Sequence, residues 1–252
     1  MSLVECIRRD QTFEIVLGRP ELGNALNSDL VCALHEAVDQ LSASDCTTVL
    51  FRGKGTGFCG GFDLRGLEDE TDASLTLRFI QLEMLLQRIA NLPKSTIAMA
   101  HGFAFGAGAD LVLACRRRIA APDLRMSFPG VRFGIALGTA RLGRLIGADK
   151  AWNILARVSP IGSEDALALG LITEIVANDE WGECDARIRA SSSSLDRRIG
   201  EIVKDALNVG NGDADLGALA RSLASPSIRD RLIAYRAALA QERAIKREPL
   251  AH

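Results

Sequence analysis

The chain has 252 residues, of which 48% are hydrophobic and 25% charged, and its formal net charge is −2. This length and composition suit one α/β domain with a sizeable core and room for an appendage. A charge so close to zero gives no basis for binding nucleic acid or a charged membrane surface. No apolar run approaches the roughly 18 residues that a spanning helix needs, and the N-terminus lacks a secretion signal. We therefore expect a cytoplasmic protein.

The cysteines are scattered along the chain and form no CxxC pair. None has a histidine nearby at the spacing of a metal site. Free thiols in a reducing compartment are therefore expected, with no disulfide and no metal. The cysteines are Cys6, Cys32, Cys46, Cys59, Cys115 and Cys184.

The first half of the chain alternates between strand and helix patterns. Residues 13–17 are predicted to form a strand, and a helical apolar spacing follows Ser28. A short apolar run at 48–51 is typical of a buried strand and ends in a glycine cluster. A second helical pattern runs over 75–90, and residues 96–100 are predicted to form another buried strand.

Helix patterns dominate the second half of the chain. After a glycine-rich turn we expect helix over 109–115, strand over 118–120, and helices over 140–146 and 150–158. A last strand is expected within 171–176, and from Trp181 onward the pattern is helical.

Strands that alternate with helices indicate crossover connections and a mainly parallel sheet. The change near residue 180 divides the chain into a core over residues 1–190 and a helical C-terminal region over 191–252. Ser191 to Ser194 are expected to form the joint between them, and Lys246 to His252 are expected to fray.

Two glycine-rich turns carry the candidate chemistry. The first runs from Gly57 to Leu64 and the second from His101 to Leu111, and each follows a predicted strand. Two strand-to-helix turns with exposed N–H groups aimed at one point would form an oxyanion hole. Tight steric packing is the alternative explanation for either turn taken alone.

Neither turn fits a nucleotide-binding loop. The segment Gly53-Lys54-Gly55-Thr56 lacks the Gly-Lys-Ser/Thr ending of a nucleoside-triphosphate loop. Leu111 stands where the dinucleotide fingerprint needs its third glycine. A dinucleotide-dependent oxidoreductase is therefore a disfavoured alternative.

Several linked motifs over residues 11–177 resemble those of the enoyl-CoA hydratase/isomerase (crotonase) superfamily, in order and at its spacing. The segment Pro20-Glu-Leu-Gly-Asn-Ala-Leu-Asn27 resembles its Arg-Pro-Glu-x-x-Asn-Ala-Leu segment. The turn from Phe58 to Leu64 resembles its Phe-x-x-Gly-x-Asp-Leu turn, and the turn from His101 to Leu111 its glycine-triplet turn. This resemblance implies a crotonase-like ββα superhelix core with a helical C-terminal appendage.

The resemblance also implies roles for individual residues. The N–H groups of Phe62 and Ala107 would hold the thioester carbonyl oxygen, and Asp110 would be the acid or base. Asp63 would support the turn that presents Phe62. The expected contacts with substrate or coenzyme A come from Asn24, Ala25, Leu26, Gly60, Gly61, Phe62, Asp63, Leu64, Gly106 and Gly130.

The departures from the family pattern concern its acids and bases. Hydratases of the family use two glutamates, and here Asp110 and Gly130 occupy those positions. Gly138 stands where some isomerases and dehalogenases of the family place an aspartate. With one carboxylate at most, ordinary hydration lacks its partner. We therefore expect slow hydration.

Other side chains could replace the missing acid or base. His101 is expected to be a turn histidine bonded to backbone rather than a catalyst, and Cys59 a buried packing residue. Arg132 and Arg141 could pair with a substrate carboxylate, although Arg141 is expected to be structural. Arg19 and Arg65 could contact coenzyme A phosphates, but a solvated surface role is favoured for both.

These inferences predict an acyl-CoA enzyme of the hydratase/isomerase type, with coenzyme A as part of the substrate and no separate cofactor. An isomerase, a decarboxylase, a thioester hydrolase and a catalytically silent CoA-binding or assembly subunit stay open. The resemblance implies a homo-trimer or a hexamer. An apolar face over residues 232–245 supports this, since a small appendage would not bury it on its own core.

Overall fold

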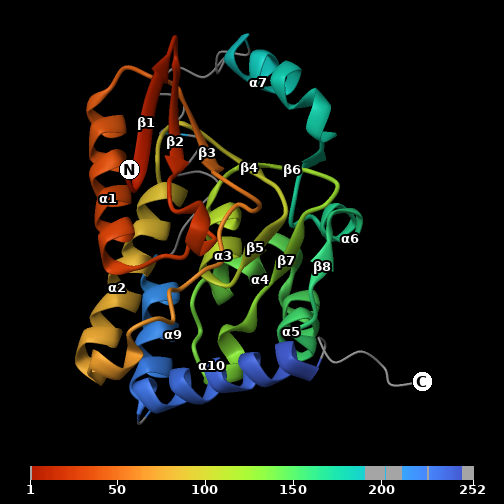
Figure 1. Cartoon of the computed structure of the whole chain (residues 1–252). Helices are drawn as coiled ribbons and strands as arrows, with labels where there is room; N and C mark the ends of the chain where they lie inside the picture. The colour runs from red at the N-terminus through yellow and green to blue at the C-terminus, as the bar shows by residue number, and fades with distance from the viewer. Residues whose placement is uncertain (1, 191–201, 203–211, 226, 246–252) are drawn as a thin grey trace.

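The computed structural model describes residues 2–190, 202, 212–225 and 227–245 (Figure 1). The predicted joint at Ser191–Ser194 and the end of the chain at Lys246–His252 lie outside the described residues. The described part is a mixed α/β fold, as predicted, with a sheet at its centre and helices around it.

Six of the described strands form the main sheet, in the order β1-β2-β3-β4-β6-β9. Strands β1 and β2 pair antiparallel, and every other neighbouring pair is parallel. Strand β1 was not predicted, because its alternating residues are half-buried or exposed and leave no apolar run. The strands are β1 (Val4–Arg9), β2 (Thr12–Leu17), β3 (Thr48–Gly53), β4 (Ser95–Ala100), β6 (Arg117–Ala120) and β9 (Glu174–Ile175).

Helices provide the crossovers that a parallel sheet requires. Helix α1 (Ser28–Ala43) joins β2 to β3, and its N-cap is Asn27, whose side chain accepts a hydrogen bond from the Leu30 N–H at 3.0 Å. Helix α2 (Asp72–Ala90) joins β3 to β4 and begins with a capping box between Thr71 and Ser74. Each helix buries one apolar stripe in the core of the protein.

A smaller sheet of three short strands begins within the second glycine turn. It consists of β5 (Phe103–Phe105), β7 (Arg125–Ser127) and β8 (Ile161–Gly162). These strands were not predicted, because two or three residues show too little periodicity to be recognised. Helix α3 (Ala107–Ala114) begins directly after β5 and is buried over its whole length, so its first turn has a fixed position.

Some bounds differ from expectation: α2 begins three residues early, α3 begins two residues early, and the last strand is only two residues long. The remaining elements surround this frame. These elements are η1 (Pro20–Leu22), η2 (Leu67–Asp69), η3 (Pro129–Phe133), α4 (Thr139–Ile146), α5 (Ala148–Arg157), α6 (Ser163–Leu169), η4 (Asn178–Glu180), α7 (Trp181–Ala190), α9 (Gly212–Leu223) and α10 (Ile228–Ile245).

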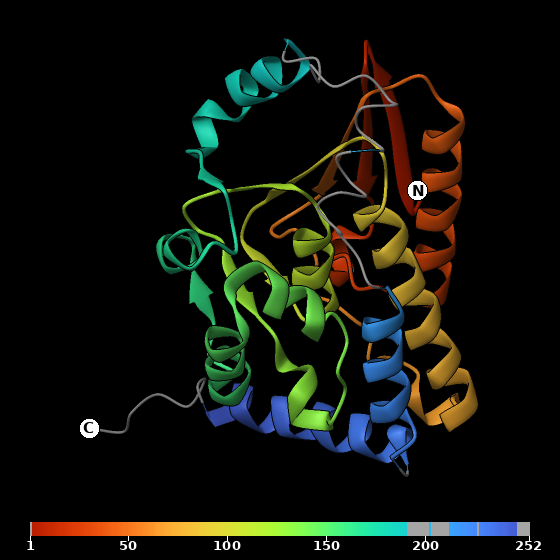
Figure 2. The ribbon, with the colours of Figure 1, turned by 180° about the vertical axis from the view of Figure 1, so that it is seen from behind.

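The C-terminal helices pack on the chain's own core. Helix α10 runs across the base of the molecule (Figure 1), and α9 lies beside α2 (Figure 2). Leu232 is fully buried in an apolar cluster with Leu75 and Phe79 of α2. The expectation that the face over residues 232–245 would lack cover on its own core is therefore wrong for its first half, whereas Ile245 is 71% exposed.

Candidate functional site

The two glycine turns lie against each other. The Phe58 N–H donates to the His101 and Phe103 carbonyls, each at 3.0 Å, and the Phe105 N–H donates to the Cys59 carbonyl at 3.0 Å. Gly61 has φ +87°, and a methyl group there would lie 2.3 Å from the Phe105 carbonyl oxygen. Only glycine allows this approach of the two backbones.

This contact brings to one cavity two residues whose N–H groups are unpaired. Phe62 and Ala107 both line it, and neither N–H donates a hydrogen bond to any described residue. Ala107 is the first residue of α3, and its φ is not positive. Alanine in place of glycine therefore costs no strain at this position.

The cavity has a volume of about 570 Å³, within the usual range for small-molecule sites. Its apolar wall includes Phe62, whose ring stacks on that of Phe79 at 4.1 Å between centroids. Phe133 and Tyr235 form a second aromatic pair at 4.7 Å. The cavity can accept an apolar group next to the two free N–H donors.

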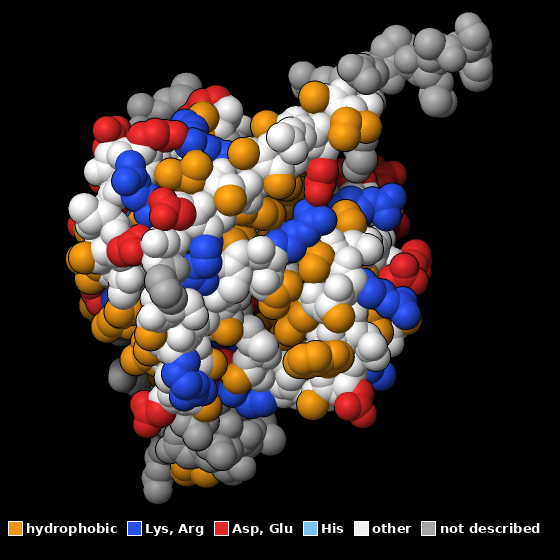
Figure 3. Space-filling model, turned by 90° about the horizontal axis from the view of Figure 1, so that it is seen from below, with side chains coloured by type: hydrophobic (Ala, Val, Ile, Leu, Met, Phe, Trp, Pro, Cys, Tyr) orange, Lys and Arg blue, Asp and Glu red, His pale blue; other side chains and the backbone are white. Residues whose placement is uncertain are grey.

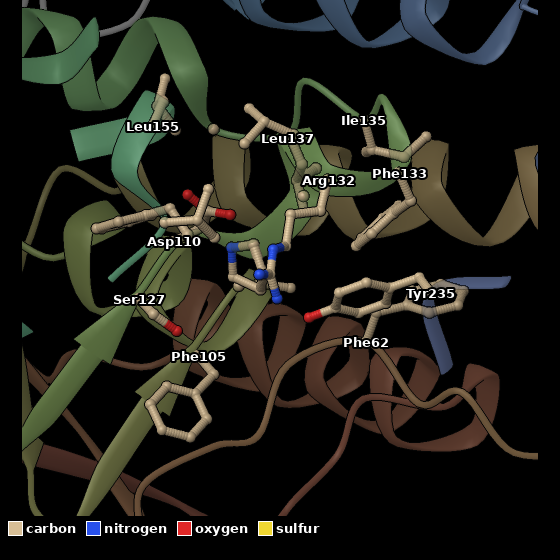
Figure 4. A pocket seen from close by; sticks show the side chains of 18 of the residues that line it. Phe62, Phe105, Asp110, Ser127, Arg132, Phe133, Ile135, Leu137, Leu155 and Tyr235 are labelled. Carbon is tan, nitrogen blue, oxygen red and sulfur yellow. The ribbon is translucent and has the colours of Figure 1, made fainter. Parts of the chain in front are cut away.

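Asp110 enters the cavity from α3, opposite Tyr235 (Figure 4). It is 4% exposed, and its carboxyl makes no hydrogen bond to any described residue. Burial raises the pKa of Asp110 well above its ordinary value; the charges of Glu83 and Asp215 add to this, while Arg141 opposes it. Its ionised form is therefore less stable, and more basic, than that of an ordinary exposed aspartate.

The two positions where the family pattern places further acids are glycines here, at 130 and 138. Gly130 lines the cavity on η3, and a methyl group there would lie 3.0 Å from the Ile135 carbonyl oxygen. Gly138 also lines it, at φ +62°. Among the described lining residues the other carboxylate is Glu242, half-exposed and paired with Arg132 at 3.1 Å.

The remaining predicted contact residues divide into two groups. The cavity is lined by Gly60, Leu64 and Gly106. Asn24, Ala25, Leu26, Gly61 and Asp63 stand outside its lining.

Asn24 has a structural role that the sequence did not reveal. Its side chain is fully buried and donates to the carbonyls of Lys54, Gly57 and Phe58 at 2.8 to 3.1 Å. The Arg19 N–H donates to its oxygen at 2.9 Å. Asn24 thus holds the first glycine turn against the segment before α1.

Asp63 links the turn that carries Phe62 to two arginines. It pairs with Arg19 at 3.2 Å and with Arg65 at 2.5 Å. Burial alone would raise the pKa of Asp63, but the hydrogen bonds and charge of Arg65 and a bond from Arg19 outweigh it and lower the pKa. The surface role expected for Arg19 is wrong, because its side chain is only 7% exposed.

Two other candidates are occupied elsewhere. His101 contacts the Gly55 carbonyl at 2.9 Å through Nε2 and stands edge-on to Trp181. Cys59 is fully buried, and burial raises the pKa of its thiol to about 12. Neither lines the cavity, in agreement with their expected structural roles.

Helix α10 supplies lining residues that sequence reasoning did not place at the site. Tyr235, Leu239, Glu242 and Arg243 reach the cavity from α10. Arg and Lys side chains lie among hydrophobic ones on the face seen from below (Figure 3). The one available signal was that Tyr235, the only tyrosine of the chain, occupies a helix otherwise rich in alanine and arginine.

The enoyl-CoA hydratase/isomerase family model matches residues 8–210. The chain belongs to the enoyl-CoA hydratase/isomerase family. A Bacillus subtilis (strain 168) protein named as a probable enoyl-CoA hydratase is 35% identical over 164 residues. The match covers 62% of this chain and only 62% of that relative's length.

Solved structures of the family show the same fold over most of the chain. An enoyl-CoA hydratase/isomerase candidate from Bordetella parapertussis is 36% identical with a TM-score of 0.89, covering 93% of this chain and 98% of that one. An enoyl-CoA hydratase from Bacillus halodurans is 27% identical with a TM-score of 0.82, covering 92% and 100%. The predicted crotonase fold class is thereby confirmed.

The described residues contain no helix long and apolar enough to cross a membrane. They also contain no group of three or more His, Cys, Asp or Glu side chains placed to hold a metal ion.

Proposed function

We propose that this protein binds an acyl-CoA thioester and moves a proton on its acyl chain, using Asp110 as the single acid and base. The observation that carries this proposal is one buried, unpaired carboxyl that shares a cavity with two unpaired backbone N–H groups. The N–H groups of Phe62 and Ala107 would receive the thioester oxygen as negative charge develops on it.

A double-bond isomerisation fits one carboxylate. Ionised Asp110 takes a proton from C2 of a 3-enoyl-CoA, and the electron pair moves into the thioester carbonyl to give an enolate. The protonated Asp110 then returns the proton to C4, the double bond moves to C2–C3, and the carbonyl re-forms. The raised pKa of Asp110 suits this cycle, because it makes the ionised carboxylate a stronger base than an ordinary aspartate.

Hydration is the second candidate, favoured by the names of the relatives. It requires one group to activate water and another to deliver a proton to the substrate. Gly130 provides no such group. The described side chains at the cavity therefore support isomerisation better than hydration.

Proton exchange in D₂O tests the proposal. A saturated acyl-CoA incubated with the enzyme should incorporate deuterium at C2, and a 3-enoyl-CoA should become its 2-enoyl isomer. Asp110→Asn should reduce both rates by about 10²- to 10⁴-fold. Asp149→Asn, an exposed aspartate on α5, is the matched control and should leave them unchanged.

The other outcomes identify the alternatives. Binding of acyl-CoA with neither exchange nor turnover would favour a silent CoA-binding or assembly subunit. Release of free CoA from the acyl-CoA would indicate thioester hydrolysis. Release of CO₂ from a carboxyacyl-CoA would indicate decarboxylation. A change in NADH fluorescence on mixing would revive the oxidoreductase and contradict the proposal.

A further inference from the structure

Behind Asp110 lies a buried group of charged side chains that the proposed chemistry does not use. Glu83 of α2, Arg141 of α4 and Asp215 of α9 are at most 7% exposed in their side chains. Arg141 Nη2 lies 3.2 Å from Glu83 Oε1 and 4.0 Å from Asp215 Oδ2. Three helices distant in sequence therefore meet at one guanidinium.

Two arginines share the two carboxylates of this group unequally. Arg141 faces two carboxylates, and Arg144, at the edge of the group, pairs with Asp215 at 2.6 Å. Glu83 Oε2, Arg141 Nε and Nη1, and Asp215 Oδ1 are buried with no hydrogen-bond partner among the described residues. Arg141 thus has donors left over, although Glu83 pairs with it at 3.2 Å and Asp215, which it shares with Arg144, lies at 4.0 Å.

Asp110 is the third carboxyl within the field of Arg141. A free buried guanidinium would draw Asp110 into an ion pair, because a buried charge is strongly stabilised by an opposite one. No hydrogen bond or ion pair joins them in the structure. The guanidinium of Arg141 faces Glu83 and Asp215 instead.

We propose that Asp215 is a positioning residue for Asp110. Together with Glu83 it neutralises Arg141, so that the Asp110 carboxyl remains unpaired and directed into the cavity. The C-terminal helix α9 thereby completes the active site without touching the substrate. This role deepens the proposed function, on which its catalytic meaning rests.

The groups around Asp110 agree with this role. Burial is the largest cause of its raised pKa, Arg141 lowers the pKa, and Glu83 and Asp215 raise it. On the cavity side, Arg132 is paired with Glu242; Tyr235, Arg157 and Arg243 line the same cavity. Strand β5, which also packs on α3, carries no titratable side chain.

Asp215→Asn tests the proposal, because it removes the negative charge with almost no change in shape. Asp213→Asn, exposed on the same helix, removes the same charge from the surface and is the control. The measurement is the protonated-carboxyl infrared band of Asp110, identified as the band that Asp110→Asn abolishes and followed against pH without substrate.

We expect the midpoint of this band to fall by about one pH unit in Asp215→Asn and to stay in place in Asp213→Asn. The pH profile of C2 deuterium exchange should move in the same direction, with kcat lowered and KM kept. Asp215→Glu should restore both. An unmoved midpoint in a folded Asp215→Asn variant would overturn the proposal.

A second variant covers the case in which Asp215→Asn does not fold. Glu83→Gln removes the other carboxylate and should also lower the midpoint; an unmoved midpoint there would likewise overturn the role. The infrared titration needs no turnover. A midpoint that moves in a protein without exchange activity would support the positioning and contradict the proposed function, so the two failures are distinguishable.

Discussion

Asp110 occupies the space that a side chain on Gly138 would need. A methyl group on Gly138 would lie 2.1 Å from Asp110 Oδ1 and 2.5 Å from its carboxyl carbon. Gly138 also has φ +62°, a conformation that favours glycine. The absence of a side chain at 138 is therefore what allows the carboxyl of 110 to lie where it does.

Gly138→Ala should displace the Asp110 carboxyl and reduce C2 proton exchange by about tenfold or more, since small misplacements of catalytic groups are costly. The left-handed backbone adds an expected stability loss of about 1 kcal/mol. Gly143→Ala is the matched control, because a methyl group there contacts nothing within 4 Å. Thermal unfolding and exchange rates are the measurements, and full exchange activity in Gly138→Ala would show that the position of Asp110 is not critical.

Asp110→Asn should stabilise the folded protein at neutral and alkaline pH. The folded pKa of Asp110 is raised above its ordinary value of 3.8, so the wild type loses stability as pH rises from about 3.8 through that raised pKa. Asparagine has no proton to lose, so its stability advantage over the wild type should be larger at pH 8 than at pH 4. Urea unfolding at pH 4 and pH 8 measures this; an equal difference at both pH values would contradict it.

Ala107→Pro should reduce polarisation of the bound thioester, because proline has no N–H and only the Phe62 donor remains. Proline is accepted at the first position of a helix, where Ala107 lies, so the fold should survive. Ala107→Gly keeps the N–H and is the control. Infrared difference spectra of a bound aromatic acyl-CoA are the measurement, and an unshifted carbonyl in a saturated wild-type site would disprove the oxyanion hole.

Hydration of crotonyl-CoA should be slow in the wild type and faster in Gly130→Glu with Asp110→Glu. Gly130 has no positive φ, and the contact to Ile135 at 3.0 Å requires the backbone to yield by a few tenths of an ångström. Gly130→Gln with Asp110→Glu has the same size without the acid and is the control. The loss of absorbance of the enoyl thioester is followed; ordinary hydratase turnover in the wild type would mean that another residue supplies the proton.

We predict a trimer or a hexamer in solution. Trp152 on α5 is 74% exposed and Leu145 on α4 is 37% exposed, and such apolar side chains gather at subunit contacts. Sedimentation at micromolar concentration measures the assembly, and Trp152→Lys should weaken it if this face is the contact. A wild-type protein that sediments only as a monomer would contradict the prediction.

Much of the fold was predictable because its long elements carry strong periodic signals. The apolar stripe of α1 and the buried runs of β3 and β4 are set by local spacing. The glycines at 61 and 106 marked the turns, because positive φ is a local demand on the backbone. The sequence by itself thus determined the core elements, the family and the two turns that carry Phe62 and Ala107.

Only the tertiary structure decided the surroundings of the site. Asp215 follows Asp110 by about a hundred residues in the sequence. In the fold it lies 4.0 Å from Arg141, in the charged group behind Asp110. Arg19 proved to be buried, and Tyr235 reached the cavity from α10. Burial, charge balance and pKa depend on which distant segments pack together, and that packing leaves no periodic signal in the sequence around any one of these residues.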